Sequence, residues 1–67
     1  MNECPLTWRE IEIIALLAGG LAWKVVGRQL GLSSGQVEWI VREAKRKTGS
    51  KTVVELVATA LRKGWIT

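Results

Sequence analysis

Apolar side chains recur every three or four residues along most of the chain, which is the spacing of an amphipathic helix. The first such segment spans residues 8–18, and its apolar stripe consists of Ile13, Ile14 and Leu17. Thr7 and Glu10 can form a reciprocal capping box at its start, and the glycine pair at residues 19–20 can end it. Because no segment alternates between apolar and polar residues, we expect helices and no sheet.

Three further helices are expected, at residues 22–30, 34–48 and 53–63. Ser33 and Gln36 can form a second capping box, and Thr52 and Glu55 a third. The helix at residues 22–30 has no Ser, Thr, Asp or Asn at its start, so its first turn is expected to fray. Every helix except this one therefore has a local signal for its first residue.

Glycines mark the connection between the second and third helices. Gly31 lies at the turn, and the Leu32 side chain that follows it can pack into the core. Gly27 lies inside the second helix, at a cost of about 1 kcal/mol relative to alanine, which suggests that the backbone of another helix approaches closely. Two helices joined by a short turn with glycine form a helix-turn-helix, whose second helix projects outward. The sequence therefore predicts an all-α, four-helix (tetrahelical) fold with an exposed helix at residues 34–48.

The helix at residues 34–48 has two chemically different sides when it is projected at 100° per residue. Its apolar side, expected to be buried, consists of Val37, Ile40, Val41 and Ala44. Its other side consists of Gly35, Trp39, Arg42 and Arg46, with Glu38 and Lys45 at one edge. Because the major groove of DNA admits an α-helix, the polar side is a candidate DNA-binding surface.

Positive charge gathers near the end of this helix. Four of the ten basic residues lie at residues 42–47, and Lys51 follows shortly after. These cations either contact phosphates or form a solvated face that complements the helix dipole. The net charge of +4 and the pI near 9.9 favour an anionic partner but also serve solubility. Within a helix-turn-helix, we favour the phosphate interpretation.

The composition argues against catalysis and against a metal site. The chain has no histidine and a single cysteine, Cys4, so it lacks both the usual general base and a cluster of metal ligands. We expect no enzyme activity and no cofactor. The N-terminus does not resemble a signal peptide, and the uncharged run at residues 13–23 is too short to cross a membrane. We therefore expect a single domain over residues 1–67, in the cytoplasm and without a membrane partner.

Two motifs and a series of single positions are similar to those of a known family. Residues 6–10 are Leu-Thr-Trp-Arg-Glu, similar to the family's Leu-Thr-x-Arg-Glu, and residues 16–20 are similar to its Leu-Leu-Ala-x-Gly. Similar positions follow in register at Val26, Leu30, Leu32, Ser33, Val37, Gly49, Glu55, Leu56, Val57 and Ala60. From Leu6 to Ile66, without a gap, the sequence resembles the DNA-binding domain of LuxR/FixJ/GerE-type bacterial transcription regulators. The resemblance implies a stand-alone bacterial or phage regulator of tetrahelical fold, whose third helix binds DNA and whose fourth often dimerises.

The resemblance also implies roles for individual residues. Glu38, Trp39 and Arg42 stand where family members contact bases, and backbone contacts are expected at or near Gln36, Lys45, Arg46, Lys47 and Lys51. The family usually has Thr at Gln36, Lys at Glu38 and His at Ile40, and Arg is common at Val53. Residues 22–27 are Ala-Trp-Lys-Val-Val-Gly where Ser-Asn-Lys-Glu-Ile-Ala is frequent. Three polar positions that could face DNA are thus apolar or acidic in this sequence.

The four tryptophans divide into two pairs. Trp8 is expected to form a staple over the first turn of its helix, and Trp65 to cover the C-terminal end of the core. Trp23 and Trp39 stand where the family prefers polar residues, so they are either partly buried or exposed. If exposed, they are candidates for a protein contact, because exposed aromatic residues are enriched at binding hot spots.

The helix at residues 53–63 has more apolar surface than one core contact requires. Leu56, Val57 and Ala60 can face the core with Val53 at the edge, and a second stripe consists of Val54, Ala58 and Leu61. Two stripes are wider than the usual apolar face of a surface helix. We expect a homodimer through this helix, the alternative being a monomer with exposed aliphatic side chains.

Two functions of different kinds remain open. The first is a dimeric transcription regulator that places the helix at residues 34–48 in the major groove of double-stranded DNA, where Arg42 can pair with guanine. The second is a protein-binding antagonist that uses the same fold to pair with another transcription regulator. Glu38, Trp23, Trp39 and the lack of a sensory domain motivate this alternative. We favour DNA binding.

Overall fold

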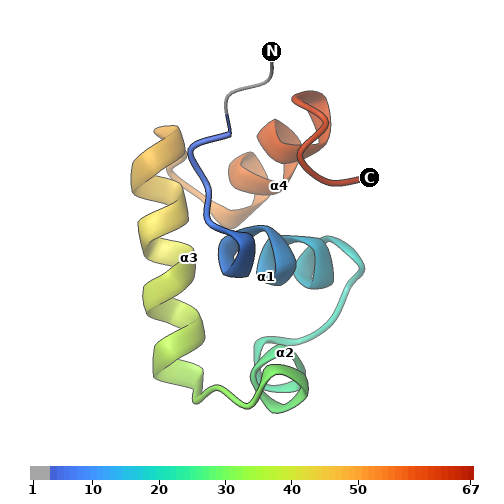
Figure 1. The fold of residues 1–67 in the computed structure, drawn as a ribbon, viewed down its shortest axis with the longest axis vertical. Helices are drawn as coiled ribbons and strands as arrows, with labels where there is room; N and C mark the ends of the chain where they lie inside the picture. Colours follow the sequence, from blue (N-terminus) through green and yellow to red (C-terminus); the bar gives the residue numbers. More distant parts are fainter. Residues whose placement is uncertain (1–3) are drawn as a thin grey trace.

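The computed structural model describes residues 4–67, and these residues form four helices and no strand (Figure 1). The helices are α1 (Trp8–Ala18), α2 (Trp23–Leu30), α3 (Ser34–Thr48) and α4 (Val53–Arg62). The all-α fold with a helix-turn-helix over α2 and α3 is therefore confirmed. The helix ends differ from the expected ones by one residue, at the start of α2 and at the end of α4.

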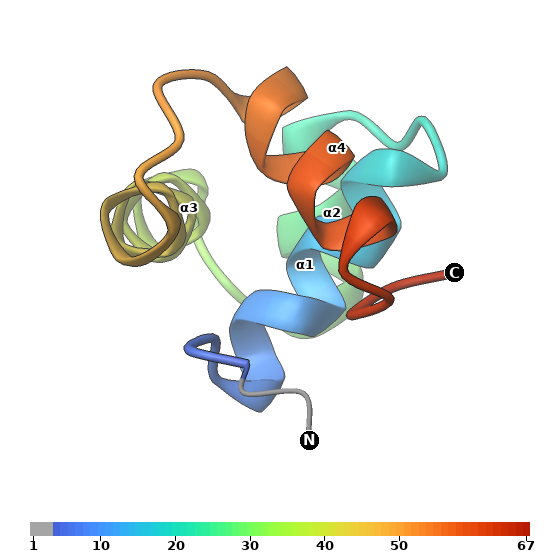
Figure 2. The same cartoon turned by 90° about the horizontal axis from the view of Figure 1, so that it is seen from above.

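α1 lies at the centre of the molecule and contacts each of the other helices. In Figure 1 it crosses between α4 above and α2 below, and these two helices make no close backbone contact with each other. α3 stands along one side, and Figure 2 shows it nearly end-on beside the other helices. This arrangement leaves one long side of α3 without a neighbouring helix.

Two of the three expected capping boxes are complete. At the start of α1, the Thr7 hydroxyl accepts from the Glu10 amide at 3.1 Å, and the Glu10 carboxylate accepts from the Thr7 amide at 2.7 Å. At the start of α3, Ser33 and Gln36 form the same pair of bonds at 3.2 and 2.8 Å. α2 begins after Ala22 with no side-chain cap, as its sequence predicted.

The third box is one-sided, which corrects the expectation for α4. The Thr52 hydroxyl accepts from the Glu55 amide at 3.1 Å. The Glu55 carboxylate, however, accepts from the amide of Lys51 at 3.0 Å and not from that of Thr52. The loop before α4 therefore sets the direction of this carboxylate, which a fixed spacing of residues could not predict.

The core is apolar and receives side chains from all four helices. Its buried members are Leu6, Ile13, Ile14, Val26, Val37, Val41, Ala44, Leu56, Ala60 and Ile66. The expected buried side of α3 is confirmed at three of its four positions, while Ile40 is half-buried at the edge. α3 is thus fixed to the core by one side only.

Gly27 lies where the chain passes closest to itself. A Cβ atom at this position would lie 2.7 Å from the carbonyl oxygen of Leu32. The close backbone therefore belongs to the turn after α2, and the expected approach of another helix is wrong. Gly31 has a left-handed backbone (φ +71°), and the Leu32 amide donates to the Gly27 carbonyl at 2.8 Å. These contacts fix the angle at which α3 leaves α2.

The tryptophans occupy three environments. Trp8 is 79% exposed, so it does not staple the first turn; the staple positions on either side of the Thr7 cap are held by the buried Leu6 and the half-buried Ile11. Trp65 packs against the core as expected, and Trp23, at the start of α2, is also partly buried against it. Trp39 is 58% exposed in the middle of α3.

Candidate nucleic-acid interface

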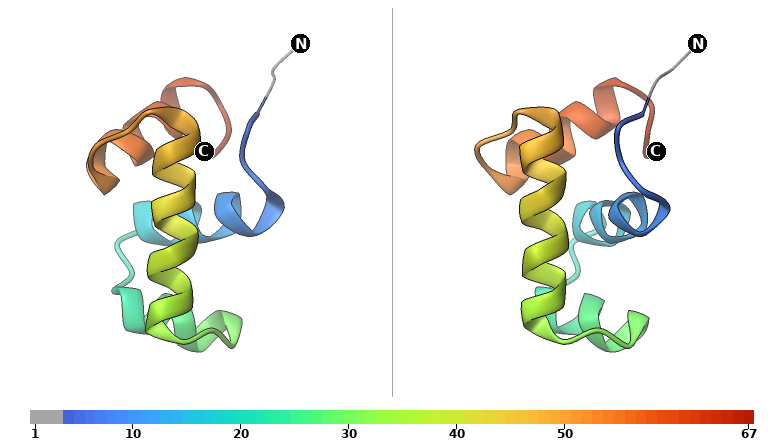
Figure 3. Two further views of the ribbon diagram at one scale, coloured as in Figure 1. Left: turned by 90° about the vertical axis from the view of Figure 1, so that its left-hand side faces the viewer. Right: turned by 60° about the vertical axis from the view of Figure 1, so that its left-hand side comes forward.

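The outer side of α3 is the surface that the fold leaves open. Figure 3 shows α3 in front of the other helices over its whole length. With fifteen residues it is about 22 Å long. Its exposed residues, opposite the buried valines, include Gly35, Glu38, Trp39, Arg42 and Arg46. A helix held in this way can enter a groove without moving the core.

Glu38 and Arg42 lie on this face with free charges. Both are exposed, and the ion pairs formed by residues 4–67 do not include one between them. Their i,i+4 spacing permits an ion pair, but the structure has none between them. An unpaired carboxylate and an unpaired guanidinium thus stand on the same helix, each available to a partner.

Arg46 is held by an acidic neighbour at the end of α3. Its Nη2 and Nε atoms donate to Glu43 Oε1 at 2.9 and 3.2 Å. Hydrogen bonding from Arg46 is the main cause that lowers the pKa of Glu43, and the same bond raises the pKa of Arg46. The pair is intact at neutral pH and is lost only as the pH falls through the lowered pKa of Glu43. The Arg46 side chain is still 66% exposed, so it can reach a phosphate.

Lys47 is engaged inside the molecule. Its ammonium lies 2.9 Å from Glu10 Oε1, the same oxygen that caps α1 through Thr7. The Glu10 side chain is only 5% exposed and that of Lys47 is 25% exposed. This ion pair joins the end of α3 to the start of α1, and no expected pairing pointed to it.

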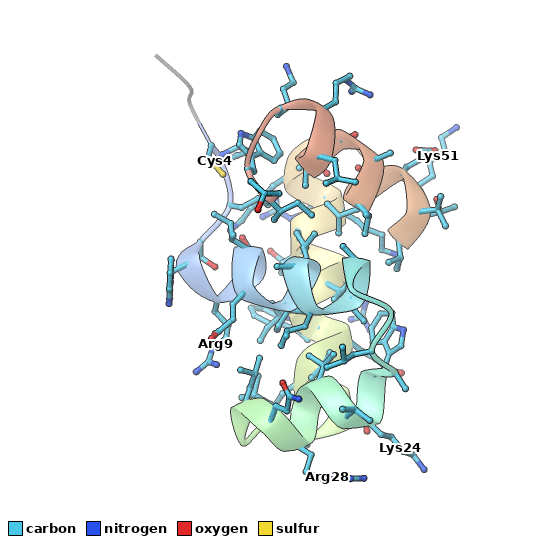
Figure 4. All side chains as sticks on the ribbon, turned by 90° about the vertical axis from the view of Figure 1, so that its right-hand side faces the viewer. Cys4, Arg9, Lys24, Arg28 and Lys51 are labelled. Atoms are coloured by element: carbon cyan, nitrogen blue, oxygen red, sulfur yellow. The ribbon has the colours of Figure 1, made fainter. Side chains whose placement is uncertain are left out.

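The remaining predicted residues lie around the same helix. Gln36 uses its side-chain oxygen in the cap with Ser33, which leaves its –NH₂ group to donate elsewhere. Lys45 is half-buried in the last turn of α3. Lys51 is exposed in the loop before α4, and Figure 4 shows it at the opposite end of the molecule from the basic residues of α2.

Two hollows flank Trp39 on one side of α3. The larger, of about 470 Å³, lies at the start of the helix and is lined by Leu32, Ser33, Gly35, Gln36, Trp39 and Ile40. The smaller, of about 260 Å³, lies toward the start of α1 and is lined by Thr7, Arg9, Glu10, Trp39, Ile40, Glu43 and Lys47. Trp39 and Ile40 line both hollows, so these two side chains lie between the two hollows.

A separate apolar surface lies on α4. Val54, Ala58 and Leu61 are exposed as expected, and the core-facing residues of α4 are buried or half-buried. A groove of about 370 Å³ runs between these side chains and the end of α1, lined by Leu17, Ala18, Val53, Val54, Val57, Ala58 and Leu61.

Metal-ligand clusters and membrane-spanning helices were sought among the described residues. Residues 4–67 contain no group of three or more His, Cys, Asp or Glu side chains placed to hold a metal ion. Among their helices, none is long and apolar enough to cross a membrane.

Known proteins share this sequence pattern. The luxR family of bacterial regulatory proteins (GerE) matches residues 4–60. The chain belongs to the LuxR family. Two similar proteins come from Bacillus subtilis (strain 168): the uncharacterized transcriptional regulatory protein YvfU is 40% identical over 65 residues, and the transcriptional regulatory protein DesR is 33% identical over 61 residues.

These alignments cover 97% and 91% of this chain but 32% and 31% of the relatives. The chain therefore spans about a third of the length of each relative. The matched region contains the helix-turn-helix and most of α4. The four-helix fold is that of a LuxR-type transcription regulator domain.

Two exposed cations of this LuxR-family domain were missed by the sequence reasoning. Lys24 and Arg28 project from α2, side by side at i,i+4 (Figure 4). They belong to the first helix of the helix-turn-helix, which crosses the DNA backbone in such motifs. The i,i+4 spacing of these two cations on a short, amphipathic helix was the sequence signal that could have identified them.

Proposed function

We propose that this LuxR-family domain is a DNA-binding transcription regulator that inserts α3 into the major groove. The observation that carries the proposal is the outer side of α3, which is free of other helices and ends in a cationic turn. The major groove is about 12 Å wide, close to the diameter of a helix with its side chains. Binding to bacterial DNA would place the protein in the cytoplasm.

Base contacts are proposed for the middle of α3. Arg42 carries an unpaired guanidinium that can donate to the O6 and N7 atoms of guanine. Glu38 can accept from the amino group of cytosine, which makes an acidic residue compatible with the groove. Trp39 lies between them in sequence and offers an aromatic surface.

Phosphate contacts are proposed for the cations and amides around α3, namely Lys24, Arg28, Gln36, Lys45, Arg46 and Lys51. Each can meet the backbone without contacting a base, which gives affinity without sequence preference. Lys47 differs, because its ammonium is already bonded to Glu10. We assign it the role of holding the cationic turn in place.

A salt titration tests this function. The logarithm of the binding constant for a duplex pool should fall linearly with the logarithm of the salt concentration, because each neutralised phosphate releases counterions. Lys45→Ala should lower the magnitude of this salt slope by about 1 and weaken binding to all DNA sequences alike. Arg42→Ala should instead reduce discrimination between sites by about 1–3 kcal/mol. Absence of binding to any duplex at low salt would refute the proposal.

We further propose that two copies pair through the outer face of α4. The exposed stripe of Val54, Ala58 and Leu61 continues into the apolar groove beside α1, and contiguous apolar surface of this kind is typical of an interface. Pairing about a two-fold axis would place two α3 helices one DNA turn apart, roughly 34–36 Å.

The antagonist hypothesis is the second candidate, and the exposure of Trp39 beside the unpaired Glu38 favours it. Glu38→Lys separates the two. For a DNA-binding protein, the variant should bind duplex pools more tightly, because it removes a negative charge facing phosphates. For an antagonist, it should leave DNA affinity near zero, and Trp39→Ala should abolish capture of the partner regulator. Tight, sequence-selective DNA binding by the wild type with no protein captured would eliminate the antagonist.

A further inference from the structure

Residue 35 has no side chain, which keeps the part of the larger hollow next to α3 open. Gly35 and Trp39 are four residues apart, so they lie one above the other on the same side of the helix. Helical side chains lean toward the N-terminus, which directs the indole of Trp39 over the turn of Gly35. A Cβ atom at residue 35 would have only Ser33 Oγ nearby, at 4.0 Å. The ring therefore has an open space beside it.

The lining of this hollow is suited to an apolar group. Leu32, Trp39 and Ile40 provide most of its wall, and no charged side chain lines it. Its polar side chains are those of Ser33 and Gln36, and each accepts a hydrogen bond from the other's backbone amide in the capping box. A strongly polar base edge placed inside the hollow would find few partners besides the Gln36 –NH₂ group.

The major groove presents one apolar group on its base edges, the C5-methyl group of thymine. The hollow opens beside the exposed face of α3, where Arg42 and Glu38 can contact polar edges of neighbouring bases. We propose that this hollow selects thymine, by receiving the methyl group between the backbone of Gly35 and the ring of Trp39. The proposal rests on the DNA binding proposed above and specifies one of its contacts.

Deoxyuridine provides the test, because it differs from thymidine only by the missing methyl group. A preferred duplex is first selected from a random-sequence pool with the wild-type protein. Each thymine of that duplex is then replaced in turn by deoxyuridine. At one thymine in each half-site, wild-type affinity should fall roughly four-fold, the amount expected for one buried carbon group.

Three variants locate the effect. Trp39→Ala removes the indole that lines the hollow, and Gly35→Ala places a methyl group of the protein where the methyl group of thymine is proposed to lie, without a close contact to other protein atoms. Both should reduce the four-fold loss to nearly none. Gly35→Ala should keep a full helical signal, because alanine favours a helix more than glycine does. Trp8→Ala removes an exposed tryptophan that does not line this hollow and should keep the loss unchanged.

The outcomes separate this inference from the function on which it rests. If the selected duplex binds but no deoxyuridine weakens binding, the thymine site is wrong and DNA binding stands. The same conclusion follows if Trp39→Ala and Gly35→Ala both retain the loss. If no duplex is selected from the pool at low salt, the DNA-binding function fails, and the thymine site fails with it.

Discussion

Replacing Lys47 by methionine tests whether the buried ion pair with Glu10 holds α3 against α1. Methionine retains an unbranched apolar side chain and a high helix propensity, so the change removes little besides the charge. It leaves the carboxylate of Glu10, whose side chain is 5% exposed, with the Thr7 amide as its remaining partner. The cost is the desolvation of this carboxylate, which the ammonium at 2.9 Å now offsets.

The magnitude follows from the burial of the two groups. Removing one partner of a fully buried pair costs about 3–5 kcal/mol. Lys47 is 25% exposed and Glu10 keeps one hydrogen bond, so we expect a smaller loss of about 2 kcal/mol. A domain of 67 residues has a total stability of roughly 3–10 kcal/mol. The melting temperature should therefore fall by about 8–16 °C.

Arg46→Met is the matched control, because Arg46 lies next to Lys47 in the last turn of α3 and also pairs with a glutamate. Its pair is exposed, and such pairs contribute about 0–1 kcal/mol. Thermal unfolding followed by circular dichroism should show a large shift for Lys47→Met and a small one for Arg46→Met. DNA affinity should show the opposite order. Equal thermal shifts in the two variants would refute the structural role of Lys47.

Three further variants test other contacts. Gly27→Ala should lower the urea midpoint, since its Cβ would lie 2.7 Å from the Leu32 carbonyl oxygen and overpacking of about 1–3 kcal/mol exceeds the gain in helix propensity. Leu61→Glu should give monomers in sedimentation with an unchanged helical signal; a wild type that is monomeric at high concentration would contradict the dimer. Glu43→Gln should release Arg46 from its pair and raise DNA affinity about two- to three-fold at low salt, a gain that should vanish at high salt.

Several functional positions were predictable because they depend on one helix alone. The two sides of α3 follow from the helical period. The exposure of Arg42 and of Gly35 could therefore be assigned from the sequence. The state of Trp39 itself could not. Its 58% exposure depends on how far α1 and the turn after α2 stand from α3.

The sequence by itself determined, to within one residue, where the helices begin and end, and it determined which side of α3 is buried. Capping bonds join residues three apart, as in Thr7 with Glu10 and Ser33 with Gln36, and the apolar period is set by the helix geometry. Both signals are local, so they can be recognised without knowing which helices pack alongside.

Only the tertiary structure decided which charges are free and where the surface is hollow. Lys47 and Glu10 are 37 residues apart in sequence, and no local pattern pairs them. Glu38 and Arg42 have the spacing of an ion pair but remain unpaired, while Trp8 is exposed although its position suggested a staple. Such contacts depend on distances between helices, and the packing of the whole core sets those distances.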